Sequence, residues 1–342
     1  MNTQNNYLYL HKYNKLLTIK FNFMEIQPAE KKDFTLSFNG QGSTFFGIVI
    51  VNWLLTALTL GIYYPWAKAK QLKFMYSSTV FNNDQFVFHG TGKEMFIGML
   101  KTLLIVFVFM SVFLGLTLID QQIMGMIILY LMMFAFLPLA IHGSYRYRMS
   151  RTSWRGIRFG YRGEKMELFW NFLKWIFLTI ITLGIYSAWL SVKMRSYVYG
   201  NIRAGNTEFK YEASGLELFI IILKGYFLSI ITLGIYMFWW QKELFEFQIN
   251  NMSLNQGDKK ISFKSTATAG GFFKLVVFNI LTLILTLGLG FAWVEVRTMR
   301  FICDNIKLNG DIDMDRISQT EENYTDAVGE EMADFFDIDL VL

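Results

Sequence analysis

The chain has 342 residues, of which 53% are hydrophobic and 17% charged, and its formal net charge is +5. An ordinary soluble domain carries nearer a quarter charged residues, so the composition excludes that class and indicates a membrane protein. The single cysteine, Cys303, excludes an intrachain disulfide framework and a cluster of thiolate metal ligands.

Residues 1–32 are expected to form an N-terminal arm that is either disordered or an upstream mis-start. Lys12, Lys15 and Lys20 lie in this arm, but no long apolar core with a small-residue cleavage site follows them. A cleaved secretory signal is therefore not expected.

Residues 33–92 contain the first copy of an eight-residue pattern, TLGIYYPW, that recurs in three variants along the chain. Self-similarity of this kind indicates a repeat architecture. In each copy we expect one long apolar segment that bends at the glycine and is anchored at the membrane interface by the tryptophan. The glycines of the four bends are Gly61, Gly184, Gly234 and Gly288, and the tryptophans are Trp66, Trp189, Trp239 and Trp293.

Residues 93–145 are predicted to form a transmembrane helical hairpin. Phe96–Ile119 and Ile123–Ile141 are apolar runs, each long enough to cross about 30 Å of hydrocarbon at 1.5 Å per residue. They flank the short polar turn at residues 120–122.

The rest of the chain divides into a basic loop with the second repeat, two further repeats and an acidic tail, at residues 146–204, 205–256, 257–310 and 311–342. Between the apolar segments, apolar and polar residues alternate, which predicts short β-hairpins on the cytoplasmic face. The tail has eleven acidic residues and one basic residue. We expect it to be a solvated arm or to dock against the basic loops.

The distribution of basic residues favours bent repeats over simple spans. If each repeat turns back at its glycine, one face of the membrane collects 28 of the 32 Lys and Arg residues, whereas six simple spans divide them almost evenly. Re-entrant backbone is tolerated only where other parts of the protein pack against it. The alternative is a gently kinked single span that ends in an aromatic interfacial belt.

A candidate polar path inside the membrane segments comprises Lys101, Lys174, Lys224, Asn52 and Asn279. Each of the three lysines follows a glutamate by seven residues, about two helical turns. Ionisable groups at membrane depth are costly and by default mark a solute or ion path. The alternative is that the lysines extend their side chains to the nearby interface.

Catalytic, cofactor-binding and metal-binding motifs are not found in the sequence. His11, His89 and His142 are isolated, without the spacing of a metalloprotease or a hydrolase triad. The basic and aromatic segment 146–165 lies beside two membrane segments, which favours anionic lipid headgroups over nucleic acid as its partner.

The repeated pattern, the basic helix after it, the segment Gly90–Phe96 and the closing segment Gly329–Leu340 together resemble the YjgN family of bacterial inner-membrane proteins. The resemblance covers about residues 33–342. It implies a protein of the bacterial cytoplasmic membrane and no established catalytic residues. The fourth copy departs from the pattern at Gly290, and only the first copy contains Pro65, so a common geometry for all four bends is open.

The predicted fold class is a mainly α, polytopic integral membrane protein with repeated helical hairpins, short cytoplasmic β-hairpins and both termini in the cytoplasm. The preferred functional hypothesis is a transporter-like or channel-like permeation unit. The alternative is a non-catalytic membrane scaffold that binds lipid or a partner membrane protein through its basic loops and acidic tail. No enzyme activity and no cofactor are expected.

Overall fold

The computed structural model describes residues 32–320, of which all but Lys32 belong to the second of the chain's two units, the one that begins at Asp33. The expectations for the N-terminal arm and for most of the acidic tail concern residues 1–31 and 321–342, which lie outside the described residues. Within the second unit, strands and helices alternate in a regular order along the chain.

Ten short strands close into one antiparallel barrel, in which each strand pairs with its neighbours in sequence and β10 lies beside β1. A lone two-stranded hairpin is marginally stable and leaves unpaired edges, and closure removes those edges. The strands are β1 Lys32–Phe38, β2 Thr79–Phe81, β3 Asp84–Phe88, β4 Thr152–Trp154, β5 Ile157–Tyr161, β6 Ile202–Ala204, β7 Thr207–Tyr211, β8 Met252–Gln256, β9 Lys259–Ser265 and β10 Ile306–Gly310.

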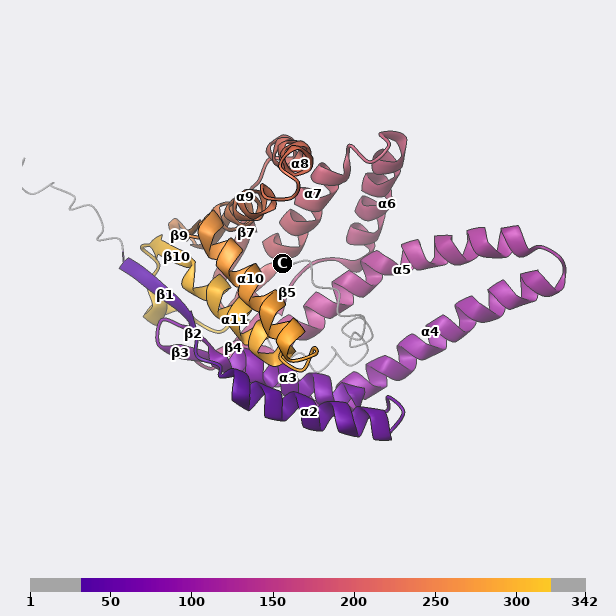
Figure 1. The fold of residues 1–342 in the computed structure, drawn as a ribbon, viewed down its shortest axis with the longest axis horizontal. Coiled ribbons are helices and arrows are strands. Elements are labelled where there is room, and N and C mark those ends of the chain that lie inside the picture. The colour runs from indigo at the N-terminus through magenta and orange to yellow at the C-terminus, as the bar shows by residue number, and fades with distance from the viewer. Residues whose placement is uncertain (1–31, 321–342) are drawn as a thin grey trace, which may run out of the picture. The chain divides into compact units, whose positions relative to one another are not determined.

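Five helical hairpins connect the strands, and each consists of an ascending helix that leaves the barrel and a descending helix that returns to it (Figure 1). The α4–α5 hairpin extends much farther from the barrel than the others. The ascending helices are α2 Gly42–Leu58, α4 Gly92–Leu118, α6 Lys165–Ile181, α8 Gly215–Ile231 and α10 Ala269–Leu285; the descending helices are α3 Tyr64–Ser78, α5 Gln122–Ser150, α7 Ser187–Gly200, α9 Met237–Asn250 and α11 Phe291–Asp304.

The order of elements places all five helical hairpins at the same end of the barrel. Neighbouring strands are antiparallel, and their connections are alternately a helical hairpin and a tight turn. Connections of one kind therefore share one end, which we call the helix end, and the tight turns share the other, the turn end. Because β1 begins and β10 finishes at the turn end, the described chain enters and leaves the barrel there.

The barrel interior is lined by a ring of ten apolar side chains, one from each strand, which we call the middle ring. Alternation along a strand points every second side chain inward, and the cross-strand register brings five inward pairs to one level. These pairs are Leu36 with Phe81, Phe86 with Trp154, Phe159 with Ala204, Phe209 with Leu254, and Phe263 with Leu308.

Residues 311–320, the C-terminal strap, pack across the turn end after β10. Ile312 and Met314 are buried. Asn206, in the turn between β6 and β7, donates its main-chain N–H to Ser318 O at 3.1 Å and its side-chain amide to Arg316 O at 3.2 Å. Side chains of the strap also bond to the barrel, as in the ion pair of Asp315 with Arg155 and the hydrogen bond from Arg158 N–H to the Gln319 side chain.

The four copies of the repeated pattern form four turns of the same conformation. Leu60, Leu183, Leu233 and Leu287 have φ of 50–51°, and the glycines that follow them have φ of 89–92°. In the first copy, the Gly61 N–H donates to Thr56 O at 2.8 Å, which closes the ascending helix, and the Tyr63 N–H donates to the Thr59 hydroxyl at 3.0 Å, which begins the descending one. In the fourth copy, the Gly290 N–H donates to Thr286 in the same way at 2.7 Å.

The predicted polytopic helical fold is wrong. The strands predicted as separate short hairpins pair side by side into one closed barrel. Among residues 32–320, two helices, Gly92–Leu118 and Gln122–Ser150, are long and apolar enough to cross a membrane. The ascending helices of the four repeats have 17 residues, about 26 Å, which is short of a full span once the chain turns back.

We expect Gly61→Ala and Gly47→Ala to change stability in opposite directions. At Gly61, φ is +92°, so a Cβ costs about 1–2 kcal/mol. Gly47 lies within the same hairpin in helical conformation with open space around it, so alanine there adds about 0.5–1 kcal/mol. Thermal unfolding of the two variants in detergent measures both effects, and equal shifts would contradict the assigned turn.

Candidate functional site: the ring of helical hairpins

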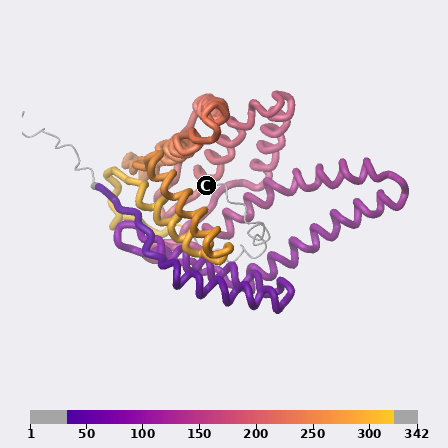
Figure 2. The backbone as a smooth tube through the Cα atoms, viewed as in Figure 1, coloured from indigo at the N-terminus to yellow at the C-terminus, as the bar shows by residue number. Residues whose placement is uncertain are grey.

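The five helical hairpins form a closed ring above the barrel. Each descending helix packs against the ascending helix of the next hairpin, and the last one, α11, packs against the first, α2. Figure 2 shows this return, with the last, orange-to-yellow helical hairpin beside the indigo helix α2. The α4–α5 hairpin lacks the repeated pattern but occupies one of the five equivalent places. One sequence feature relates it to the repeats: Glu94 and Lys101 are seven residues apart, as are a glutamate and a lysine in the second and third repeats.

Three of the four tryptophans pack between neighbouring hairpins. Trp66, Trp189 and Trp293 lie against the first residue of the next ascending helix, which in each case is a glycine. A Cβ at Gly92, Gly215 or Gly42 would lie 2.3–2.4 Å from the indole, so these contacts require glycine. Each indole also contacts a phenylalanine four residues farther along that helix: Phe96, Phe219 or Phe46. Trp239 is half-exposed, and the next ascending helix, α10, begins with alanine.

The apex of each short hairpin is an exposed leucine. Leu60, Leu183, Leu233 and Leu287 are 93–94% exposed and adopt the left-handed conformation, which normally favours glycine or asparagine. A leucine in this place is unfavourable in water both for its backbone and for its side chain. These four residues were not among the sequence-predicted site residues, although the repetition of Leu before Gly was a signal for them.

A level of polar side chains lies nine or ten residues from each short-hairpin glycine, about 14 Å below the apex. We call it the polar belt; it comprises Asn52, Lys174, Lys224 and Asn279 on ascending helices and Lys70, Lys193, Glu243 and Arg297 on descending helices. Lys101 belongs to the same level, since it lies nine residues into α4 as Lys174 and Lys224 do in α6 and α8.

Several sequence-predicted polar residues pair within their own hairpin. Lys224 donates to Glu243 at 2.7 Å. Asn279 accepts from Arg297 at 2.9 Å. Asn52 is buried and donates to Ala67 O at 3.3 Å. Each of these contacts joins an ascending helix to its descending partner, so it fixes the hairpin.

The glutamates that precede the lysines lie at the barrel, in the first turn of the ascending helices. There a carboxylate is stabilised by the partial positive charge of the helix N-terminus. Glu94 forms a capping box with Thr91 and an ion pair with Arg151 at 3.1 Å. Glu167 accepts from the Tyr197 hydroxyl at 3.1 Å. The glutamate and the lysine seven residues later therefore lie at two different levels, the glutamate at the first helical turn and the lysine at the polar belt, and they do not pair with each other.

The helix end of the barrel interior is lined by a further set of inward-facing aromatic residues. Phe88, Tyr161 and Tyr211 have the same strand parity as middle-ring residues and are buried. Burial raises the pKa of the Tyr161 and Tyr211 hydroxyls above their usual value, so both stay neutral. Large neutral side chains therefore lie between the barrel interior and the ring.

Within residues 32–320, no three His, Cys, Asp or Glu side chains gather as a metal site. His89 contacts the Ser153 hydroxyl at 2.8 Å, and His142 contacts Gly163 O at 2.9 Å. Cys303 is buried, which raises the pKa of its thiol to about 11. Its thiolate fraction at neutral pH is therefore very small.

The fold and the ring define a class of protein: a β-barrel that carries apolar helical hairpins at one end, two of whose helices have the length and composition of membrane spans. The chain belongs to the family described as bacterial protein of unknown function (DUF898), whose model matches residues 33–180, 176–223 and 239–335. The resemblance to the YjgN family is confirmed.

Similar curated proteins are named inner membrane protein YjgN. The one from Salmonella typhimurium strain LT2 is 31% identical over 161 residues, which is 47% of this chain and 39% of that protein. The one from Escherichia coli K12 is 30% identical over 133 residues, which is 39% of this chain and 32% of that protein. The matched segments thus span well under half the length of these relatives. No solved structure matches the chain.

We expect Lys224→Met to destabilise the protein by about 1 kcal/mol, because it leaves the Glu243 carboxylate without its ion-pair partner. Glu243→Gln in the same background should recover part of the loss. Lys174→Met is the matched control at the equivalent place in α6, where the lysine is exposed, and its effect should stay within about 0.5 kcal/mol. Equal losses at both lysines would contradict a hairpin-specific pair.

Proposed function

We propose that the protein is a non-catalytic scaffold of the cytoplasmic membrane that binds lipid through its ring of hairpins. The barrel lies at the cytoplasmic surface with its turn end, and therefore both ends of the described chain, facing the cytoplasm. The polar belt lies among the anionic headgroups of the inner leaflet, the four short hairpins enter that leaflet, and the α4–α5 hairpin crosses the bilayer.

The observation that carries this proposal is the set of four exposed apex leucines. In water, these leucines would be unfavourable twice, because the left-handed backbone is strained for leucine and the apolar side chain is exposed. Hydrocarbon reverses the side-chain preference, because leucine favours the bilayer. The names of the relatives, inner membrane proteins, support the same environment.

The helix lengths agree with the proposed depths, one leaflet for the short hairpins and the whole bilayer for the α4–α5 hairpin. From belt to apex, a short hairpin rises about 14 Å, close to one leaflet of a roughly 30 Å hydrocarbon core. In α4, 17 residues separate Lys101 from the last residue, Leu118, about 26 Å farther on. The polar turn 120–122 then reaches the opposite interface.

The charge of the belt supports a headgroup location. Lys70, Lys101, Lys174, Lys193 and Arg297 lie at this level, in addition to Lys224, which pairs with Glu243. Each basic group near an anionic surface contributes about 1 kcal/mol of attraction. The aromatic contacts of the belt, such as Lys193 over the Tyr186 ring at 5.6 Å, are typical of that interface.

A lipid scaffold fits these contacts better than a permeation unit does. A polar path would need its side chains to face a shared interior, whereas Lys224, Asn52 and Asn279 bond within their own hairpins. The barrel below the ring is lined by apolar and neutral aromatic side chains, which offer no replacement for the hydration shell of an ion.

The sign of the stability change on Leu183→Asn tests the environment of the apex. In water, asparagine relieves left-handed strain by roughly 1 kcal/mol, so the variant would be more stable. In hydrocarbon, burial of the amide costs about 2 kcal/mol or more, so we expect net destabilisation. Reversible unfolding in bicelles provides the measurement. Leu183→Ala, which adds no polar group, serves as the control, and stabilisation by asparagine would refute insertion.

Cysteine accessibility tests the topology, with the buried and poorly ionised Cys303 retained as a silent background. With a membrane-impermeant maleimide, Gln121→Cys should label from the periplasm of intact cells. Asn201→Cys, Asn255→Cys and Ser318→Cys should label after the inner membrane is permeabilised. Leu183→Cys should label only after denaturation.

Two outcomes would contradict this topology in different ways. Labelling of Leu183→Cys from the periplasm would mean that the short hairpins cross the bilayer. Labelling of Ser318→Cys from the periplasm would mean that the barrel faces the other compartment. Gln121→Cys is the matched positive control, since it lies at the apex of the one long hairpin.

A further inference from the structure

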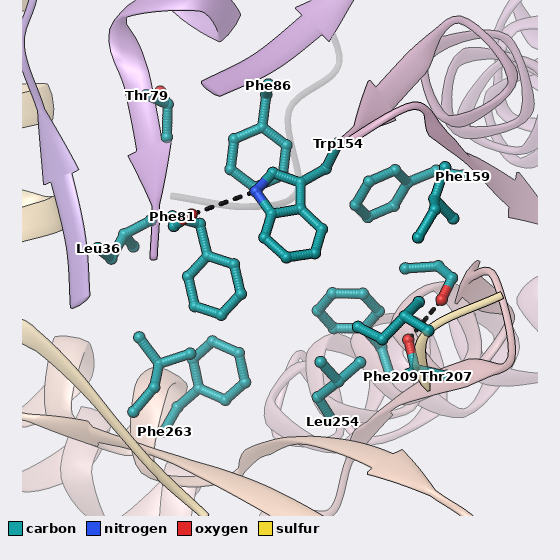
Figure 3. Close-up of a pocket in the computed structure, with 14 residues that line it drawn as sticks. Leu36, Thr79, Phe81, Phe86, Trp154, Phe159, Thr207, Phe209, Leu254 and Phe263 are labelled. Carbon is teal, nitrogen blue, oxygen red and sulfur yellow. Dashed lines mark hydrogen bonds between the residues drawn. The ribbon is translucent and has the colours of Figure 1, made fainter. Parts of the chain in front are cut away.

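The barrel encloses an apolar cavity of about 250 Å³ at the level of the middle ring (Figure 3). Every one of the ten strands contributes to its wall, and aromatic rings such as Phe86, Trp154 and Phe209 project into it. A ten-stranded barrel is wider than the eight-stranded barrels that side chains just fill, so a cavity follows from the strand number.

The polar atoms nearest to this cavity are already bonded within the wall. The indole N–H of Trp154 donates to Phe81 O at 3.2 Å, and the Thr207 hydroxyl donates to Ala204 O at 2.7 Å. No charged side chain is found among the described lining residues. A polar ligand would lose its hydrogen bonds to water without replacement, so the cavity selects an apolar molecule.

The volume of the cavity limits the size of the ligand that it can hold. A cavity of roughly 150 Å³ lined by aliphatic and aromatic residues takes up a molecule as small as benzene. The volume of about 250 Å³ therefore has room for a larger apolar group, such as one medium-length hydrocarbon chain. We propose that the barrel binds a single medium-length hydrocarbon chain, supplied either by a free fatty acid or by the acyl chain of a membrane lipid.

The turn end provides the access side. Ile317 of the C-terminal strap lines the cavity, whereas the other described lining residues lie in strands. The strands are fixed by the hydrogen bonds of a closed barrel, and the strap can separate without breaking that closure. At the helix end, the buried rings of Phe88, Tyr161 and Tyr211 obstruct passage. This inference goes beyond the proposed scaffold. With the turn end in the cytoplasm, as proposed above, a free fatty acid enters directly, whereas the chain of a membrane lipid enters only after that lipid has left the bilayer.

Photo-crosslinking of the full chain in lipid nanodiscs tests the site. The probe is dodecanoic acid with a diazirine near its methyl end, and mass spectrometry maps the labelled peptides. We expect labelling of peptides that carry Phe209 and Leu254. Ala204→Phe adds a ring to the cavity and should lower this labelling at least tenfold, while Val87→Phe adds the same ring on the barrel exterior and should leave it unchanged.

A second variant keeps the proposal testable if Ala204→Phe does not fold. Phe209→Ala enlarges the cavity, so it should shift the preference from the dodecanoic probe to a hexadecanoic one by several-fold. Competition separates the two sources: displacement by dodecanoic acid without displacement by dilauroyl phosphatidylglycerol indicates a free acid, and displacement by dilauroyl phosphatidylglycerol indicates a lipid chain. The proposal would be overturned if the probe labelled only the hairpins. It would also be overturned if a folded Ala204→Phe variant kept its barrel labelling and the Phe209→Ala variant kept its preference for the dodecanoic probe.

Discussion

Antiparallel closure of the barrel is the constraint on which the rest of the structure depends. A closed antiparallel sheet has two ends, and consecutive connections must alternate between them. Four of the nine connections are tight turns and five are helical hairpins, so all apolar helices leave one end. The placement of all apolar hairpins at one end and all tight turns at the other is therefore a result of topology.

Local chemistry gives each hairpin its length and direction. The threonine of the repeated pattern bonds to both helices, and the glycine accepts the positive φ that reverses the chain. A polar contact at the belt then joins the two helices, as in the pair of Lys224 and Glu243. In the hairpins that begin with α4 and α6, a first-turn glutamate also bonds to the returning segment. Contacts between hairpins are of another kind, since an indole lies on a helix-terminal glycine.

The proposed scaffold and the proposed chain-binding cavity use two different apolar surfaces of the protein. Apolar residues on the outside of the hairpins meet lipid, and apolar residues on the inside of the barrel form the cavity. The two surfaces are separated by the buried aromatic residues at the helix end, such as Tyr161 and Phe88. A hydrocarbon chain in the barrel is thereby distinct from the lipid around the ring.

The sequence by itself determined the bends, because Thr-Leu-Gly fixes a turn through bonds within a few residues, and it determined the apolar character of the helices and the family. It also predicted short β-hairpins near residues 79–92 and 205–215. Only the tertiary structure decided that these strands close into a barrel, since pairs such as Phe86 with Trp154 join residues far apart in sequence. For the same reason, the sequence did not separate polar residues that bond within a hairpin from those that line a path: the partner of Lys224 is 19 positions away on another helix.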